Sequence, residues 1–461
     1  MVIRHVVVVG GGISGLAAAF ALQRPGITVD VFDGAAVLGG KLRVSDVEGV
    51  AVDEGAEAFL TVSPEVVDLA RAVGLVDEVV HPATTSASIA VDGGLRPLPS
   101  GTVLGVPGDL AALAASGVLT PAGLARACAE VGAGDPFAGD VSVGELVRRR
   151  LGDEVVDRLV DPLLGGVYAG RADLLSLEAT VPALAAVLRD QPSLLAAAAA
   201  VRPSATRSGP VFASLRPGLG ALVPAVAGRL AGEVRLRLPV RGIRRLGHRF
   251  RLVTGPVPHP TYFEADAVVV AAPAPPAARM LREVAPAAAT ELARIDYAST
   301  AIVTLAYPPS HLPPGSGLLV AGSEGRAVKA VTFSSHKWAH LAGGLTLVRA
   351  SVGRYGDEVT LQRDDGDLAA LAADDVAALT GLRTLPVAHR VTRWGGALPQ
   401  YAVGHLDRVR RIEESVGQVP GLAVAGAAYA GVGVPACIRS GYAAAERIAE
   451  HLDRLGQSDY D

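Results

Sequence analysis

The residues that most clearly suggest chemistry stand near the start of the chain, where Gly10, Gly12 and Gly15 follow a run of valines in the spacing G-x-G-x-x-G. Glycine at these places permits a tight turn, close approach of the backbone to a pyrophosphate, and close packing of a helix on a strand. The first amides of that helix would then face the phosphates. The expected phosphate contacts are Gly10, Gly11, Gly12, Ile13, Ser14 and Gly15.

An acidic residue stands where the same fingerprint requires one. Asp33 ends the next hydrophobic segment, about 20 residues beyond the glycines, where a carboxylate can accept hydrogen bonds from an adenosine ribose. Because the apolar segments, the glycine turn and the acid are in register, we predict a dinucleotide site. The alternative is a glycine turn in an α/β protein that binds no nucleotide.

These residues need particular elements to position them. The apolar pattern predicts a βαβ unit, with a strand over 5–9, a helix over 13–22 and a strand over 28–33. Ala, Leu, Val and Arg at helical spacing, interrupted by prolines, predict a helical insertion between about 101 and 203. Strand-like segments between 299 and 353 predict a mostly antiparallel sheet. The end of the chain returns to α/β character.

Composition narrows the functional classes. A chain of 461 residues exceeds the usual size of one core, so two or three units are expected. Its 42 basic and 46 acidic residues are not clustered, which argues against a nucleic-acid partner. Cys128 and Cys437 are isolated, which fits a reducing cytoplasm. No apolar run approaches the roughly 18 to 20 residues of a membrane span, whereas peripheral attachment through an apolar helical face remains open.

Two segments after the βαβ unit favour FAD over a nicotinamide. They read LGGKL at 38–42 and DEGAEAF at 53–59. Both resemble the loops that extend the FAD site in glutathione-reductase-like flavin oxidases of the amine oxidase type, so the resemblance implies non-covalent FAD. The residues implied in cofactor binding are Gly40, Lys41, Gly55, Ala56, Glu57 and Ala58.

Four further stretches make the resemblance more specific. They read DPLLGGVYAG at 161–170, VFASLRPGL at 211–219, WGGALPQY at 394–401, and GAAYAGVGVPACIRSG at 426–441. In this order they are similar to segments of the FAD-dependent protoporphyrinogen and coproporphyrinogen oxidases of Gram-positive bacteria, and the similarity covers nearly the whole chain.

The resemblance implies an α/β fold in three parts. A glutathione-reductase-like Rossmann FAD domain is expected from 1–95, 205–295 and 390–461. A helical insertion, of a kind that often binds membranes, is expected over 96–204, and an antiparallel-sheet substrate domain over 296–389.

Individual roles also follow from the resemblance. Val240 matches the position beside adenine, Trp394 the aromatic residue near the isoalloxazine ring, and Val432, Gly433 and Val434 the segment under the flavin. Gly426 opens that C-terminal flavin segment. Gly166, Tyr168 and Arg171 are implied in substrate binding. For each residue the alternative is ordinary packing.

The chain departs from the family in two places, and other features suggest no further site. Arg171 replaces an acidic residue, and Val37-Leu38 replaces a basic one before the glycine pair. His336 and His340 have helical metal-ligand spacing without an evident third ligand, so no metal is expected. The run 148–150, three arginines, is expected to form a solvated helix face. No catalytic base can be named.

The implied activity is oxidation of a porphyrinogen by dioxygen within haem biosynthesis, with removal of six electrons and release of three hydrogen peroxide molecules. Coproporphyrinogen III is the expected substrate, because Lys41, Lys329 and Lys337 are the only lysines in an arginine-rich chain typical of high-G+C bacteria, which commonly use the coproporphyrin route. Protoporphyrinogen IX is the alternative. More remote are another FAD amine oxidase or desaturase and a non-catalytic flavin-binding scaffold. Transient contact with other haem-pathway enzymes is also implied.

Overall fold

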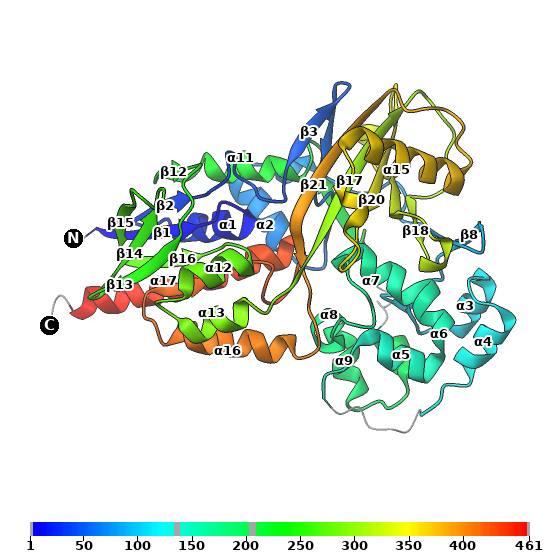
Figure 1. The fold of residues 1–461 in the computed structure, drawn as a ribbon, viewed down its shortest axis with the longest axis horizontal. Helices are drawn as coiled ribbons and strands as arrows, with labels where there is room; N and C mark the ends of the chain where they lie inside the picture. The colour runs from blue at the N-terminus through cyan, green and yellow to red at the C-terminus, as the bar shows by residue number, and fades with distance from the viewer. Residues whose placement is uncertain (1–2, 133–138, 202–208, 459–461) are drawn as a thin grey trace.

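The computed structural model describes residues 3–132, 139–201 and 209–458. Figure 1 shows two large sheets, each with helices packed against it. A separate group of helices is formed by residues between about 110 and 201. The chain passes repeatedly between the two sheets, so segments far apart in sequence meet where these parts adjoin.

The first sheet is parallel throughout and has the order β12-β2-β1-β16-β22. Its strands read as nearly continuous apolar runs because helices or a smaller sheet cover both faces, and Val6, Val7 and Val8 are fully buried. The strands are β1 (Arg4–Val9), β2 (Ile27–Phe32), β12 (Val234–Arg235), β16 (Ala267–Val270) and β22 (Leu422–Val424).

Side chains alternate between the two faces of this sheet. Val6 and Val8 pack against the helices α1 (Ile13–Ala21) and α17 (Val434–Ser458). Val7 and Val9 belong to the core on the other face. That core includes residues of α12 (Ala274–Leu281), α13 (Pro286–Leu292), α16 (His405–Gly417), β13 (Gly242–Leu246), β14 (Arg249–Thr254) and β15 (Thr261–Ala265).

Smaller elements join the two sheets. Helices α2 (Glu65–Val73) and α11 (Leu222–Ala227) pack against α1 and α17 in one apolar cluster. The strand β11 (Phe212–Leu215) pairs with β5 (Phe59–Leu60) and β6 (Val79–Val80), and β3 (Val44–Val47) pairs with β4 (Val50–Asp53).

The second sheet has the order β21-β17-β20-β19-β18-β7-β8 and is antiparallel except for the β18–β7 pair. Helix α15 (Asp365–Thr380) covers one face, where Val303, Val348 and Ala350 pack against Leu368 and Val376. The strands are β7 (Ser88–Val91), β8 (Gly94–Pro97), β17 (Tyr297–Tyr307), β18 (Gly317–Val320), β19 (Val328–Phe333), β20 (Thr346–Val352) and β21 (Ala388–Pro399).

Strand pairing differs in part from the boundaries expected from the sequence. Strands β7, β8 and β21 pair within the second sheet, whereas the expected boundaries place 88–95 and 390–399 with the FAD-binding part. The β7–β8 hairpin joins through the parallel register of β7 with β18, a long-range pairing that local sequence does not encode.

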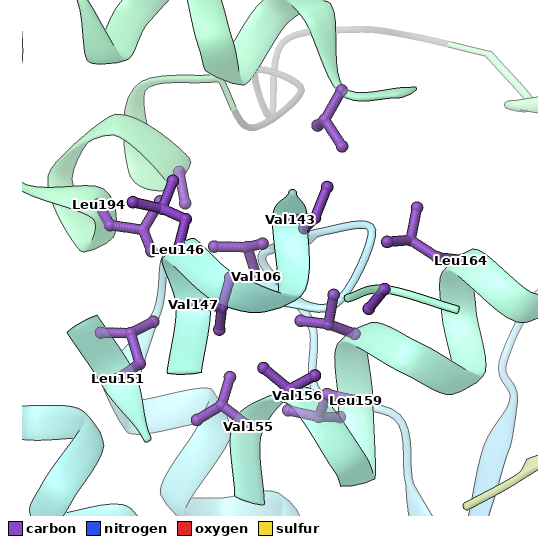
Figure 2. Packing of buried hydrophobic residues seen from close by; sticks show 14 of the residues in the cluster. Val106, Val143, Leu146, Val147, Leu151, Val155, Val156, Leu159, Leu164 and Leu194 are labelled. Atoms are coloured by element: carbon purple, nitrogen blue, oxygen red, sulfur yellow. The ribbon is translucent and has the colours of Figure 1, made fainter. Parts of the chain in front are cut away.

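The chain between Leu110 and Val201 is mostly helical where the structure describes it. Capping side chains of Asp109, Thr120, Ser142 and Ser176 start four of its helices. Figure 2 shows Leu146, Val147, Val155, Val156 and Leu159 meeting in its core. The helices are α3 (Leu110–Ser116), α4 (Pro121–Cys128), α5 (Val143–Leu151), α6 (Asp153–Val155), a π-helical turn (Val156–Val160), α7 (Asp161–Tyr168), α8 (Leu177–Thr180), α9 (Pro182–Leu188) and α10 (Leu194–Val201).

The expectation for the arginine run in α5 is wrong at Arg150. Its side chain is 2% exposed, lies 3.5 Å from a carboxylate oxygen of Glu130, and donates to the carbonyl oxygen of Pro192. The same helix places Arg148 at the surface among Asp153, Asp157 and Asp173. Within the residues that the structure describes, no helix combines the length and apolarity needed to cross a bilayer.

Candidate cofactor and substrate site

The glycine turn before α1 leaves open space where a phosphate is expected. A Cβ built on Gly10 would lie 2.5 Å from Ala271 O, and one on Gly15 would lie 1.9 Å from Gly10 O, so packing alone requires both glycines. A Cβ on Gly12 would meet no heavy atom within 4 Å. Gly12 is also the N-cap of α1, without a side-chain cap. These features fit a pyrophosphate at the helix N-terminus.

Asp33 fixes the other side of this turn. Its Oδ2 accepts a hydrogen bond from Gly11 N at 2.6 Å, and its Oδ1 accepts one from Ala35 N at 2.7 Å. Leu238 N donates to Asp33 O at 2.8 Å. The structure therefore brings the segment before Val240 close to Asp33. This proximity is expected if Val240 contacts the adenine and Asp33 contacts the adjoining ribose.

The loop with Gly40 and Lys41 lies over the glycine turn. Gly39 N donates to Gly11 O at 2.8 Å, and a Cβ on Gly40 would be 3.5 Å from Gly12 Cα. Burial lowers the pKa of Lys41. Burial also raises the pKa of the Cys437 thiol, in the first turn of α17, and that thiol interacts electrostatically with Lys41. The predicted Lys41 thus lies between the glycine turn and the start of the last helix.

The second predicted loop contacts both Lys41 and Trp394. A Cβ on Gly55 would lie 2.0 Å from Lys41 O and 3.6 Å from Trp394 Cζ2. Trp394 Nε1 donates to Glu54 O at 2.9 Å, and the Arg43 guanidinium lies 5.2 Å from the centre of the indole ring. Three segments that the sequence assigned to FAD binding therefore meet at one place, although nearly 340 residues separate Gly55 from Trp394.

Glu57 connects this loop to the second sheet through two cations that the sequence did not reveal. Lys337 Nζ lies 2.5 Å from Oε1, and Arg349 Nη1 lies 2.5 Å from Oε2. Burial on its own would raise the pKa of Glu57, but the two cations outweigh that effect and hold the pKa at about 2. Arg349 also donates to Gly55 O at 2.6 Å. Direct cofactor contact by Glu57, and by its neighbours Ala56 and Ala58, stays a prediction.

The Gly-rich segment before α17 is connected to α7 through Tyr401. The Tyr401 hydroxyl donates to Ala427 O at 2.6 Å and accepts from Gly431 N at 2.9 Å. The rings of Tyr168 and Tyr401 lie 5.6 Å apart, and His405 stacks on Tyr401 at 4.0 Å. The predicted substrate residue Tyr168 thus lies close to the segment that ends at Val432, Gly433 and Val434.

None of these three rings is suited to proton transfer at neutral pH. Burial raises the pKa of Tyr168 to about 12 and raises that of Tyr401 further. Burial lowers the pKa of His405 to about 4, and its Nε2 donates to Tyr429 O at 3.0 Å. The tyrosines are therefore protonated and the histidine is neutral.

Gly426 resembles Gly12 in its surroundings. Its φ is +130°, and an added Cβ would meet no heavy atom within 4 Å. Gly426 N donates to Ser440 Oγ at 3.0 Å. The glycine therefore exposes backbone at the start of the predicted flavin segment, where a side chain would be strained by the φ angle alone.

The face of the second sheet opposite α15 is incompletely covered. Ile302, Leu319, Ala330, Thr332 and Ser351 are half-buried, whereas the α15-facing residues between them are buried. The strand register places Trp394, Thr300 and Arg349 on this same face. We call it the open sheet face. It extends from Trp394, the residue predicted near the flavin, and Arg349 toward α7, where a Cβ on the predicted Gly166 would lie 3.5 Å from Leu319 Cδ2.

A cavity of about 300 Å³ lies at the end of this face, where β18 and β20 end and β19 begins. The predicted Arg171 lines it together with Lys329 and Arg354, which sequence reasoning missed. The sequence signal for Lys329 was its rarity as one of three lysines, and nothing indicated Arg354. Among the described residues, no group of three His, Cys, Asp or Glu side chains is placed to hold a metal ion.

Comparisons with known proteins identify the family of this chain. Residues 13–449 match the family of flavin-containing amine oxidoreductases. A coproporphyrinogen III oxidase of Mycobacterium tuberculosis is 40% identical over 98% of each chain, and one of Bacillus subtilis is 32% identical over 97% of this chain and 98% of the other.

A solved structure from Exiguobacterium sp. 255-15, provisionally named a protoporphyrinogen oxidase, has a TM-score of 0.86 and 33% identity over 98% of this chain and 99% of the other. Almost the whole length of the chain thus matches flavoenzymes. The same chain carries the glycine turn before α1, Asp33 and the two loops that meet at Gly55. The chain belongs to the family of flavin-containing amine oxidoreductases, and FAD is its cofactor.

Proposed function

We propose that this enzyme oxidises coproporphyrinogen III to coproporphyrin III with dioxygen, releasing three hydrogen peroxide molecules. The observation that carries the proposal is the full-length similarity, at 40% identity, to relatives named coproporphyrinogen III oxidase. The reaction is balanced, because three dioxygen molecules accept the six electrons and six hydrogens that the porphyrinogen loses.

The geometry supports a flat, largely apolar substrate. The open sheet face offers Ile302, Leu319 and Ala330, and α7 presents Gly166 toward it. Gly166 is exposed and adds no side chain beside Leu319, which suits a flat macrocycle lying against the open sheet face. The carboxylate arms of such a substrate need cations, and these gather at the cavity that Arg171 lines.

FAD supplies the two-electron acceptor for each of the three oxidation steps and is restored by dioxygen. The protein positions and shields the reacting carbon. Gly12 and Gly426 leave space for the cofactor, while Trp394 and Arg349 hold the Gly55 loop against it. Tyr401 fixes the Gly-rich flavin segment through its two backbone hydrogen bonds. No protein base is assigned, since Tyr168, Tyr401 and His405 keep their protonation states near neutral pH.

Protoporphyrinogen IX is the second candidate, favoured by the name of the Exiguobacterium structure. The proposal as a whole is tested by anaerobic and aerobic turnover of the yellow holoenzyme without nicotinamides. We expect oxygen-dependent turnover with three peroxide molecules per porphyrin. A requirement for added NAD or NADP would contradict it.

The proposal also includes a cytoplasmic location, peripheral contact of the helical region (96–204) with the inner face of a membrane, and transient contact with other haem-pathway enzymes. It keeps the three-part division expected from the sequence, with β7, β8 and β21 assigned to the substrate-binding sheet. Exposed Val167, Leu174, Val403 and Leu406 support a membrane contact, because Leu175 bridges Ala402 and so brings Leu174 beside Val403. Flotation with anionic vesicles tests this, and Leu174→Ser with Val403→Ser should abolish co-flotation.

A further inference from the structure

The cavity at the end of the open sheet face is unusually rich in positive charge. Arg171, Arg326, Lys329 and Arg354 line it, and among the described residues Asp357 is the single acidic one in its lining. Backbone of Gly322, Gly325 and Gly353 forms much of the remaining wall. A cavity of this composition suits an anion, since small wall residues allow approach and the cations attract negative charge.

Two of the four cations already have carboxylate partners. Arg354 Nη1 lies 2.5 Å from Asp161 Oδ2, and Arg326 Nη1 lies 3.4 Å from Asp375 Oδ1. Within the part of the chain that the structure describes, Lys329 and Arg171 form no ion pair with a carboxylate. The cavity therefore holds two basic side chains that have no carboxylate partner among the described residues.

Lys329 is the more informative of the two. Its side chain is 6% exposed, and the one hydrogen bond of its ammonium group goes to Gly353 O at 2.7 Å. An ammonium group has three donors, so this geometry leaves two without a protein acceptor among the described residues. Burial, together with the nearby Arg354 charge, lowers the pKa of Lys329 to about 7. A buried lysine of this kind beside a cavity is characteristic of a ligand-binding group.

Arg171 is held at the rim by the same acid that pairs with Arg354. Asp161 Oδ1 accepts from Ala172 N at 2.9 Å, while its Oδ2 pairs with Arg354. Asp161 therefore connects the loop that carries Arg171 to Arg354, which follows the end of β20. The Arg171 side chain itself remains exposed and free to meet a ligand.

We propose that this cavity binds the two carboxylate arms that coproporphyrinogen has and protoporphyrinogen lacks, with Lys329 and Arg171 as their pairing residues. This inference rests on the proposed function and names the residues that determine its substrate preference. The cavity lies next to the open sheet face along the chain, because Val320, which follows Leu319, and Gly353, two residues after Ser351, both line it. A macrocycle lying on that face would thus direct its arms toward Lys329.

The test measures binding of the stable products, coproporphyrin III and protoporphyrin IX, to the FAD-loaded enzyme by fluorescence titration. The variants are Lys329→Met and Arg171→Met. Each loses one charge-assisted contact, so the Kd for coproporphyrin III should rise about tenfold, while the Kd for protoporphyrin IX should stay within about twofold. Arg171→Lys should retain most of the affinity. Arg383→Met is the matched control, because it deletes one exposed positive charge from the loop that follows α15.

Folding and substrate roles are separated by a second readout. Because the Lys329 ammonium has no carboxylate partner, Lys329→Met should keep full FAD occupancy and an unchanged or higher Tm. Equal weakening of both porphyrins, or no weakening, overturns the assignment. Should the wild-type enzyme turn over protoporphyrinogen preferentially while the variants still lose coproporphyrin selectively, the proposed function fails and the carboxylate site stands.

Discussion

Gly441 of α17 contacts the backbone of Ser14 in α1 so closely that a Cβ on Gly441 would lie 2.2 Å from Ser14 O. This contact sets how closely the last helix can approach the first. It thereby holds the start of α1, which follows Gly12, against α17, which begins at Val434, as the predicted cofactor contacts of both segments require. A crossing of this kind lets residues more than 400 positions apart form one binding site.

Gly441→Ala is therefore expected to separate the two helices, destabilise the protein by about 1–3 kcal/mol and lower FAD occupancy. Gly456→Ala in the same helix is the control, because an added Cβ there meets no heavy atom within 4 Å. That change should be neutral or slightly stabilising. Denaturant unfolding and the flavin absorbance per chain measure both. Equal behaviour of the two variants would refute the account of this crossing.

Gly12→Asp should lose FAD without losing the fold. The protein leaves room for the added side chain, but its carboxylate would occupy the place of the pyrophosphate and repel it. Gly343→Asp, at an exposed position with equally open surroundings, should keep its cofactor. Circular dichroism and bound flavin are the measurements. Full FAD occupancy in Gly12→Asp would show that the phosphate turn is assigned wrongly.

Glu57→Gln should destabilise the protein, because buried Arg349 and half-buried Lys337 would remain without their shared counter-ion. The expected loss in the free energy of unfolding at pH 7 is about 3 kcal/mol. The pKa of Glu57 is depressed, so its stabilisation is present above pH 4.5 and is lost as the pH falls toward 2. The stability difference between wild type and variant should shrink over that range. Exposed Glu446→Gln serves as the control, and a loss as small as the control's would count against the ion-pair account.

Lys329 should make stability depend on pH in a second, higher window, and in the same direction as Glu57. Its pKa is lowered from 10.5 to about 7, so the unfolded chain binds more protons than the folded protein between these values. Stability therefore rises with pH in this window. From pH 7 to 9 the free energy of unfolding of wild type should gain about 2 kcal/mol relative to Lys329→Met. Arg171, Arg326, Arg354 and Asp357 line the same cavity. Parallel pH profiles for the two proteins would contradict a buried lysine of lowered pKa.

The sequence predicts most reliably those features that are encoded by local spacing. Gly10, Gly12, Gly15 and Asp33 are close in sequence and belong to one βαβ unit, so their meeting follows from the unit itself. Trp394 was predicted through resemblance alone, and its contact with Glu54 depends on the packing of the second sheet against the Gly55 loop.

Features that depend on strand register or on helix packing were not predicted. Arg349 reaches Glu57 only because β20 pairs between β17 and β19 with this residue on the open sheet face. Lys329 lies at a register irregularity between Val328 and Ala330, where the regular alternation of side chains between the two sheet faces is interrupted. Its side chain lines the cavity. Arg150 follows two other arginines in α5, but the helix turns it toward Glu130 and Pro192. Local composition carries no information on any of these three outcomes.

The central claim concerns the substrate, and the ratio of kcat/KM for coproporphyrinogen III to that for protoporphyrinogen IX tests it most directly. Both should be measured on the same FAD-loaded enzyme at equal oxygen and detergent. If Lys329 and Arg171 each contribute a charge-assisted hydrogen bond of about 1.5 kcal/mol in the transition state, the ratio should be on the order of a hundred in favour of coproporphyrinogen III. A ratio below one would contradict the substrate assignment while leaving the flavin oxidase intact.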